Sequence, residues 1–214
     1  MLRFLTLLVC ASLLAGCSLI GIRSAYEQPA YVLVETLSDE ILIRRSTPIL
    51  AVETTVDILG HDEAQDAAFR RLFDYISGAN LKDEITNVTD TATPLPKSEE
   101  ISMTTPVETS RTGTNGIRMR FFLPAKWTFE TAPKPTDLRV QLVEVPGQLQ
   151  AVFRFSGLAS EEEIAKNTKT LKSLLHKSSW YPASTPVTHI YDPPWTIPFL
   201  RRNEIVIPVL PASS

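Results

Sequence analysis

Cysteine is scarce in this chain, which has two in 214 residues, Cys10 and Cys17. Cys10 lies inside an apolar amino-terminal run typical of a secretion signal, which is removed during export. Cys17 follows the run and is expected to carry lipid. We therefore expect the mature chain to have no disulfide and no thiol available for catalysis or metal binding.

The chain also lacks an excess of basic residues and the common catalytic motifs. The chain has 21 Lys and Arg against 24 Asp and Glu, with a net charge of −3, so no basic stripe is available to neutralise nucleic-acid phosphates. The sequence contains no Gly-x-Ser-x-Gly, no glycine-rich phosphate loop and no His-Glu-x-x-His. His61, His176 and His189 have no metal-binding spacing. The sequence thus predicts a protein that is not an enzyme and holds no protein-bound metal.

The amino terminus has the pattern of an export signal. Arg3 supplies a positive charge, Phe4–Leu14 is apolar, and Leu-Ala-Gly-Cys ends at Cys17. The small residues before this cysteine resemble a bacterial lipobox, which implies diacylglyceryl transfer to Cys17, cleavage before it and acylation of the new amino group. Two or three acyl chains give firm membrane anchoring. The alternative is an uncleaved anchor.

These features divide the chain into a signal peptide over residues 1–16, a lipidated cysteine with its tether over 17–29, and a folded domain over 30–214. Lipoprotein sorting in double-membraned bacteria offers a further resemblance. Ser18, rather than Asp, follows the cysteine, which implies the outer membrane, facing the periplasm.

Two amphipathic helices are predicted in the domain. The first lies within His61–Asn80, where an apolar face recurs at helical spacing. Asp62 is expected to cap it in a capping box with Gln65, and Gly78 to end it. The second opens with a Ser160–Glu163 capping box and runs to about Lys177. The apolar faces are Phe69, Leu72, Phe73 and Ile76 in the first helix, and Ile164, Leu171, Leu174 and Leu175 in the second.

Strands are predicted on both sides of each helix from alternation and turn residues. The order strand, strand, helix, strand, strand occurs twice. We interpret it as one α+β domain of two pseudo-repeats, in which each helix packs on a curved, largely antiparallel sheet. The predicted strands are Tyr31–Thr36, Ile41–Arg45, Leu50–Ile58, Ile101–Thr109, Gly116–Leu123, Leu138–Val145, Leu149–Ser156, Val187–Tyr191 and Asn203–Val209.

A set of short motifs occurs in one order over Tyr26–Val209. The motifs are Phe69–Asn80, Met103–Val107, Phe121–Pro124, Pro133–Asp137, Phe155–Gly157, Tyr191–Trp195 and Arg201–Glu204. Together they resemble the SOUL haem-binding protein family. The resemblance implies a distorted antiparallel β-barrel of two pseudo-repeats with one packed helix each, a fold shared with effector-binding domains of some transcription regulators. It also implies tetrapyrrole binding in a shallow apolar site beside the first helix.

The resemblance names the candidate site residues. Phe69 and Phe73 occupy positions where the family sets apolar side chains against the macrocycle, and Met103 and Met119 are expected to line the same cavity. His61 is the histidine nearest this pocket and the candidate for an axial ligand. Core packing for the phenylalanines and methionines, and a capping or solvent position for His61, are the alternatives.

The functional prediction is a lipid-anchored envelope protein that binds haem, or another planar amphipathic molecule, without transforming it. The alternative is an envelope interaction or structural lipoprotein with no small-molecule ligand. Asp66 and Asp74 on the first helix favour this alternative, because they would repel haem propionates. Near the carboxyl end, Arg201–Glu204 is expected to form a structural polar cluster. An anionic-ligand role is the other interpretation there, because a guanidinium fork suits carboxylates.

Overall fold

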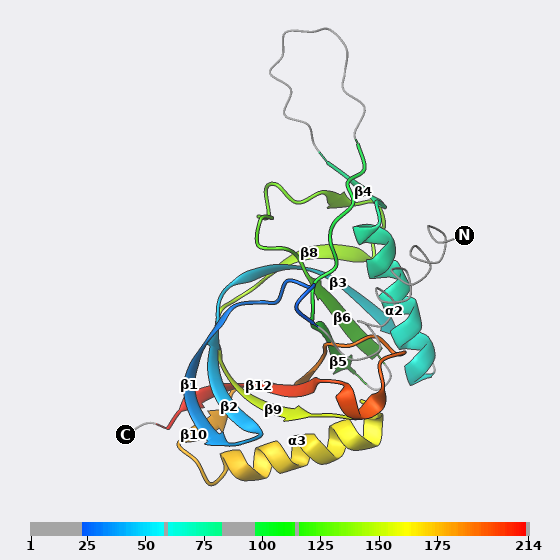
Figure 1. The fold of residues 1–214 in the computed structure, drawn as a ribbon. Coiled ribbons are helices and arrows are strands. Elements are labelled where there is room, and N and C mark those ends of the chain that lie inside the picture. The colour runs from blue at the N-terminus through cyan, green and yellow to red at the C-terminus, as the bar shows by residue number, and fades with distance from the viewer. Residues whose placement is uncertain (1–22, 58–59, 83–96, 114–115, 213–214) are drawn as a thin grey trace, which may run out of the picture. The chain divides into compact units, whose positions relative to one another are not determined.

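The computed structural model describes residues 23–57, 60–82, 97–113 and 116–212 (Figure 1). The chain divides into two compact units. Unit 1 contains Tyr31–Arg45 and Leu149–Ser214 together with the chain up to Glu27, and unit 2 contains Gln28–Ala30 and Ser46–Gln148. The signal peptide and Cys17 lie outside the described residues, so the predictions for them stay predictions.

Unit 2 is an antiparallel sheet in the order β5-β6-β3-β8 with one helix, α2, packed on β3, β6 and β8. A short strand pair, β4 with β7, lies outside this sheet. The elements are β3 (Ile49–Asp57), α2 (His61–Ile76), β4 (Asn80–Leu81), β5 (Val107–Thr112), β6 (Gly116–Phe122), β7 (Lys134–Pro135) and β8 (Val140–Val145).

The core of unit 2 lies between α2 and the inner face of the sheet. Alternate residues of β6 are buried there, as the alternation predicted, and so are alternate residues of β3. On the helix, Ala64, Ala68 and Leu72 are completely buried. Phe69 and Phe73 are not, with 39% and 48% of their surface exposed. The small side chains of Ala64 and Ala68 bring the helix close to the sheet, so the buried stripe lies on their side of the helix.

Unit 1 has the same plan, with sheet order β1-β2-β9-β12-β11, β10 on β12, and helix α3 packed on β9, β10 and β12. Leu171 and Leu175 of α3 are completely buried in its core, with Ile205 and Ile207. The elements are β1 (Tyr31–Ser38), β2 (Ile41–Ser46), β9 (Leu149–Phe155), α3 (Glu161–Leu175), β10 (Trp180–Pro182), β11 (Val187–Ile190), the single-turn η1 (Pro198–Leu200) and β12 (Asn203–Pro211).

The two pseudo-repeats exchange their first strands. Along the chain the repeats are β2-β3-α2-β5-β6 and β8-β9-α3-β11-β12. In the sheets, however, β2 pairs with β9 of the second repeat and β8 pairs with β3 of the first. Each unit therefore contains the first strand of the other repeat. The predicted α+β fold of two sheet-plus-helix repeats is confirmed.

The helix ends match the sequence in one case and differ in the other. Ser160 caps α3, and its Oγ accepts a hydrogen bond from the Glu163 N–H at 3.3 Å, as predicted. The predicted Asp62 cap is wrong. The N-cap is Gly60, with φ of 118°, and no side chain caps the helix. Because the chain enters α2 through this positive φ, the helix begins two residues earlier than an Asp62 cap would allow, and Asp62 lies inside its first turn.

Other local differences are small. Leu174 was predicted on the buried face of α3 but is 40% exposed. The strand predicted from Ile101 begins at Val107, after the cis peptide bond between Thr105 and Pro106. The short strands β4, β7 and β10 were not predicted, because two or three residues are too few to show alternation. None of the helices in the described residues has the length and apolar character needed to cross a bilayer.

Candidate functional site

The exposed side of α2 carries a pair of stacked aromatic rings. The rings of Phe69 and Phe73 have centroids 6.0 Å apart and planes inclined by 13°. Phe69 also meets the buried Phe121 ring of β6 edge-on, at 5.2 Å and 63°. The pair is therefore fixed by the core beneath it, while about half of its surface faces solvent. Such a flat, rigid apolar surface is suited to a planar partner.

The other predicted site residues differ in exposure. Met119 is buried, with 4% exposure, in the same core cluster as Phe121. Met103 is partly buried and packs against that cluster. His61 is the first residue of α2, and the position of its side chain lies outside what the structure describes. The structure thus brings Phe69 and Phe73 together at the surface and sets Met119 in the core.

A small cavity of about 170 Å³, with both polar and apolar lining, opens beside α2. Arg71, Asp74 and Tyr75 line it from the helix, with Asp137 from the segment before β8. Hydrogen bonds from Arg139 lower the pKa of Asp137 to about 2, so this carboxylate stays ionised at neutral pH. The volume is below the range of about 300–1,000 Å³ usual for small-molecule sites. The cavity is thus too small for a tetrapyrrole.

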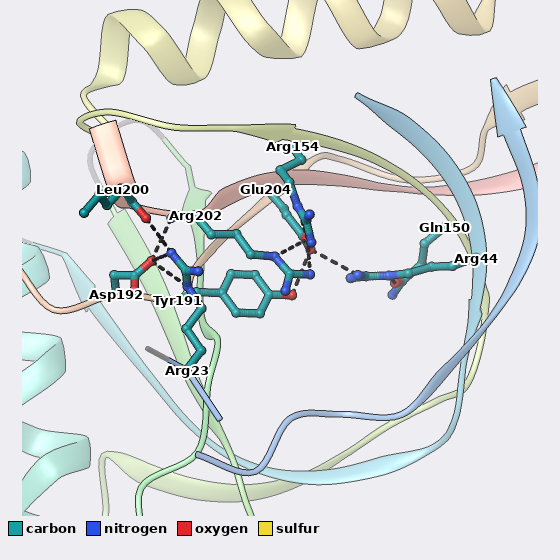
Figure 2. Close-up of polar contacts among 9 residues, drawn as sticks. All are labelled: Arg23, Arg44, Gln150, Arg154, Tyr191, Asp192, Leu200, Arg202 and Glu204. Atoms are coloured by element: carbon teal, nitrogen blue, oxygen red, sulfur yellow. Dashed lines mark hydrogen bonds and ion pairs between the residues drawn. The ribbon is translucent and has the colours of Figure 1, made fainter. Parts of the chain in front are cut away.

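Unit 1 contains a second candidate feature, a buried ionic cluster centred on Glu204 of β12 (Figure 2). Glu204 accepts hydrogen bonds from Arg44 at 3.1 Å, from the Tyr191 hydroxyl at 2.8 Å, and from two nitrogens of Arg202 at 2.9 and 2.5 Å. Arg154 lies 3.8 Å away and is half exposed. We call Arg44, Gln150, Arg154, Tyr191, Arg202 and Glu204 the Glu204 network.

Strand register creates the Glu204 network. Arg154 is the direct cross-strand neighbour of Glu204 on β9, and His189 is its neighbour on β11. Arg44 extends from β2, two strands away, and its Nε donates to Gln150 at 3.2 Å. Its guanidinium also lies over the Tyr31 ring, 4.8 Å from the centroid.

The titration behaviour of the Glu204 network argues against acid–base catalysis. Burial by itself raises the pKa of Glu204, but Arg44, Arg202 and His189 outweigh burial and lower it. Burial and the neighbouring Glu204 raise the pKa of Tyr191. The carboxyl group therefore stays ionised and the phenol stays protonated near neutral pH. A general acid or base needs a pKa close to the working pH, so neither group is suited to that role.

Sequence reasoning found part of this cluster. Arg202 and Glu204 were expected in a structural polar cluster, and the structure confirms this. Arg44 and Tyr191 were missed because Arg44 is 160 residues from Glu204 in the chain and no local pattern marks it. His189 was expected to be a packed core residue and is 5% exposed. Within the described ranges, no three His, Cys, Asp or Glu side chains are grouped so as to hold a metal ion.

Comparison with known families matches residues 26–208 to the SOUL heme-binding protein family. This is most of the chain. The chain belongs to the SOUL family. As a SOUL domain it contains the predicted pair of sheet-plus-helix repeats, and the predicted family membership is confirmed. No curated protein sequence matches the chain.

Solved structures share this fold at low sequence identity. The C-terminal domain of EcmrR has a TM-score of 0.59 and 9% identity, over 81% of this chain and 98% of that one. A hydrolase from Listeria innocua has a TM-score of 0.50 and 9% identity, over 86% of this chain and 93% of that one. At these identities the likeness shows the fold alone.

Proposed function

We propose that this SOUL protein is a lipid-anchored component of the cell envelope. Its domain binds haem, or a related planar amphipathic molecule, on the aromatic surface of α2 and does not transform it. The observation that carries the binding proposal is the rigid, exposed stack of Phe69 on Phe73 in a member of a haem-binding family. A lipobox-like sequence ending at Cys17 carries the anchoring proposal.

The charge around the aromatic pair limits the kind of ligand. Arg70 of α2 is exposed, and so are four carboxylates of this helix: Asp62, Glu63, Asp66 and Asp74. A bound haem would therefore keep its propionates directed away from the helix, or the ligand would carry fewer carboxylates than haem. Like-charge repulsion across water at a surface is modest and is screened by salt. The acidic residues thus weaken haem binding without excluding it.

Haemin titration tests the binding site directly. The protein is a chain that begins at Ser18, which leaves out the signal and the acylated cysteine. We expect a saturable shift of the Soret band. A double variant, Phe69→Ser with Phe73→Ser, should weaken binding about tenfold or more, since it removes apolar contact worth more than about 1.4 kcal/mol. Leu138→Ser is the matched control, because Leu138 is 95% exposed in the same unit.

The dimethyl ester of haemin separates ring recognition from charge. Without carboxylates it should bind at least as tightly as haemin, and haemin binding should strengthen with salt. Absence of any Soret change at micromolar haemin, in folded protein, would refute the haem proposal. If a protein partner copurifies instead and binds at the α2 surface, the protein is better described as a lipoprotein that binds other envelope proteins. The exposed acidic residues beside the aromatic pair favour that second candidate.

Radiolabelled palmitate tests the anchor. The full chain produced in a double-membraned bacterium should incorporate palmitate and sediment with the outer membrane. Cys17→Ala should remove both properties, because Cys17 is the only cysteine that follows the apolar run. Palmitate incorporation by the alanine variant would contradict the assignment of Cys17.

A further inference from the structure

An exposed apolar segment lies between β11 and β12 of unit 1. In the segment Pro193–Leu200, which we call the aromatic loop, Trp195 is 63% and Phe199 is 72% exposed, and Ile197 is 37% exposed. Leu158 adds to this surface with 56% exposure, because the N–H of its neighbour Gly157 donates to the Pro198 carbonyl at 2.9 Å. Large apolar side chains grouped in this way mark an interaction surface more often than single ones do.

The backbone of the aromatic loop has few polar groups that need water as a hydrogen-bond partner. Three of its eight residues are prolines, which have no N–H to satisfy. Arg201 follows the loop and folds back over it, and its guanidinium donates to the carbonyls of Thr196, at 2.8 Å, and Pro194. Backbone N–H groups satisfy the carbonyls of Pro193, Ile197 and Pro198. Most carbonyls of the loop are therefore paired and three of its N–H groups are absent, which lowers the cost of moving its backbone into a lipid interface.

The charge of the aromatic loop is also suited to a membrane surface. No carboxylate occurs from Pro193 to Arg202, although the whole chain is acidic. The nearest one, Asp192, has a side chain only 3% exposed and is paired with Arg23. Arg201 follows the loop directly and is partly exposed, whereas Arg202 is paired with the buried Glu204. Basic residues beside apolar side chains favour contact with anionic lipid head groups.

Arg23, near the amino-terminal end of the described chain, is hydrogen-bonded to this same loop and to the residue before it. Arg23 donates two hydrogen bonds to Asp192, at 2.9 and 2.6 Å, and a third to the Leu200 carbonyl at 2.6 Å (Figure 2). Cys17 precedes Arg23 by six residues, which span at most about 20 Å when fully extended. Acyl chains on Cys17 would therefore hold the bilayer surface within about 20 Å of the Arg23 contact.

We propose that the aromatic loop is a membrane-docking element, whose Trp195 and Phe199 enter the boundary between head groups and acyl chains of an anionic bilayer. This proposal rests on the proposed lipidation of Cys17. Tryptophan is enriched at this boundary, because its ring is apolar while its N–H remains able to donate. The anchor then sets where the protein is, and the loop sets which side of unit 1 faces the lipid.

An environment-sensitive fluorophore on a single cysteine tests the docking. In the lipidated full chain the Cys17 sulfur carries diacylglyceryl through a thioether and the signal with Cys10 is removed, so a cysteine introduced by Phe199→Cys supplies the free thiol. Leu210→Cys is the matched control. Leu210 is 60% exposed and lies near the other end of β12, seven residues from Asn203 and so about 23 Å away along the strand. The protein is reconstituted into phosphatidylethanolamine–phosphatidylglycerol vesicles, and its lipidation is checked by palmitate labelling.

We expect a blue shift at position 199, with quenching by nitroxide on the lipid acyl chains, and neither effect at position 210. Adding Trp195→Ser should reduce both effects. Labelled protein that contains palmitate and floats with the vesicles, yet reports water at position 199, overturns docking and leaves the anchor standing. Equal shifts at both positions also overturn it, as does shielding of position 199 in native membranes but not in pure lipid, which indicates a protein partner. A chain without palmitate overturns the anchor, and docking with it.

Discussion

Replacing the buried carboxylate at the centre of the Glu204 network should strongly destabilise the protein. Glu204→Gln keeps the size of the side chain but removes the charge that two buried guanidinium groups share. The side chains of Arg44 and Arg202 are 6% and 16% exposed, and that of Glu204 is 2% exposed. Removing one partner of such a pair leaves uncompensated buried charge, and typically costs about 3–5 kcal/mol. We expect a loss of that size at pH 7.

The pH dependence of this loss follows from the pKa of Glu204. Its pKa is lowered in the folded protein from the ordinary value of 4.5. A carboxyl group with a depressed folded pKa adds stability above its unfolded pKa, and this stability is lost as the pH falls through the folded value. The difference between wild type and the glutamine variant should therefore be full at pH 7 and shrink below about pH 4.5.

Urea unfolding followed by circular dichroism at several pH values measures both quantities. Glu163→Gln is the matched control. It breaks the exposed pair with Lys166, whose atoms are 3.2 Å apart, and should cost less than about 0.5 kcal/mol. If Glu204→Gln unfolds within about 1 kcal/mol of wild type at pH 7, or if the gap does not change in acid, the network does not stabilise unit 1 as argued.

Two further predictions concern the helices. Leu72→Ala should cost about 2–5 kcal/mol of stability because Leu72 is completely buried. Phe73→Ala should cost about 1 kcal/mol or less, mostly from the lost ring stacking. Thermal unfolding compares the two variants, and similar losses would mean that the side of α2 with Leu72 is not the side that faces the core. Ser160→Ala should cost about 0.5–2 kcal/mol by removing the cap of α3, and Ser160→Asp should restore most of it; equal stability of all three proteins would show that the cap contributes nothing.

The sequence predicted local structure well where a few neighbouring residues decide it. The Ser160–Glu163 box opens α3 as expected, since both groups lie within one turn. Alternation along β6 placed Met119 and Phe121 inward correctly. The expected Asp62 cap failed because Gly60 takes a positive φ and α2 starts two residues earlier than that cap requires. The pattern that predicts a cap says nothing about such a backbone angle.

The candidate surfaces depended on packing that the sequence pattern does not contain. Phe69, Leu72, Phe73 and Ile76 share a helical face, yet the helix rests on Ala64, Ala68 and Leu72. How closely a helix approaches a sheet depends on every side chain at the contact. The exposure of the aromatic pair, on which the binding proposal depends, therefore became visible only in the folded protein.

The sequence by itself determined the two sheet-plus-helix repeats and the family, because alternation, helical spacing and ordered motifs are properties of short stretches of chain. The tertiary structure decided that the repeats exchange β2 and β8, and that Arg44 meets Glu204 across 160 residues. It also decided that Arg23 is held against the aromatic loop. Strand register and pairing minimise the free energy of the whole chain, so contacts between distant residues follow only once all the strands are in place.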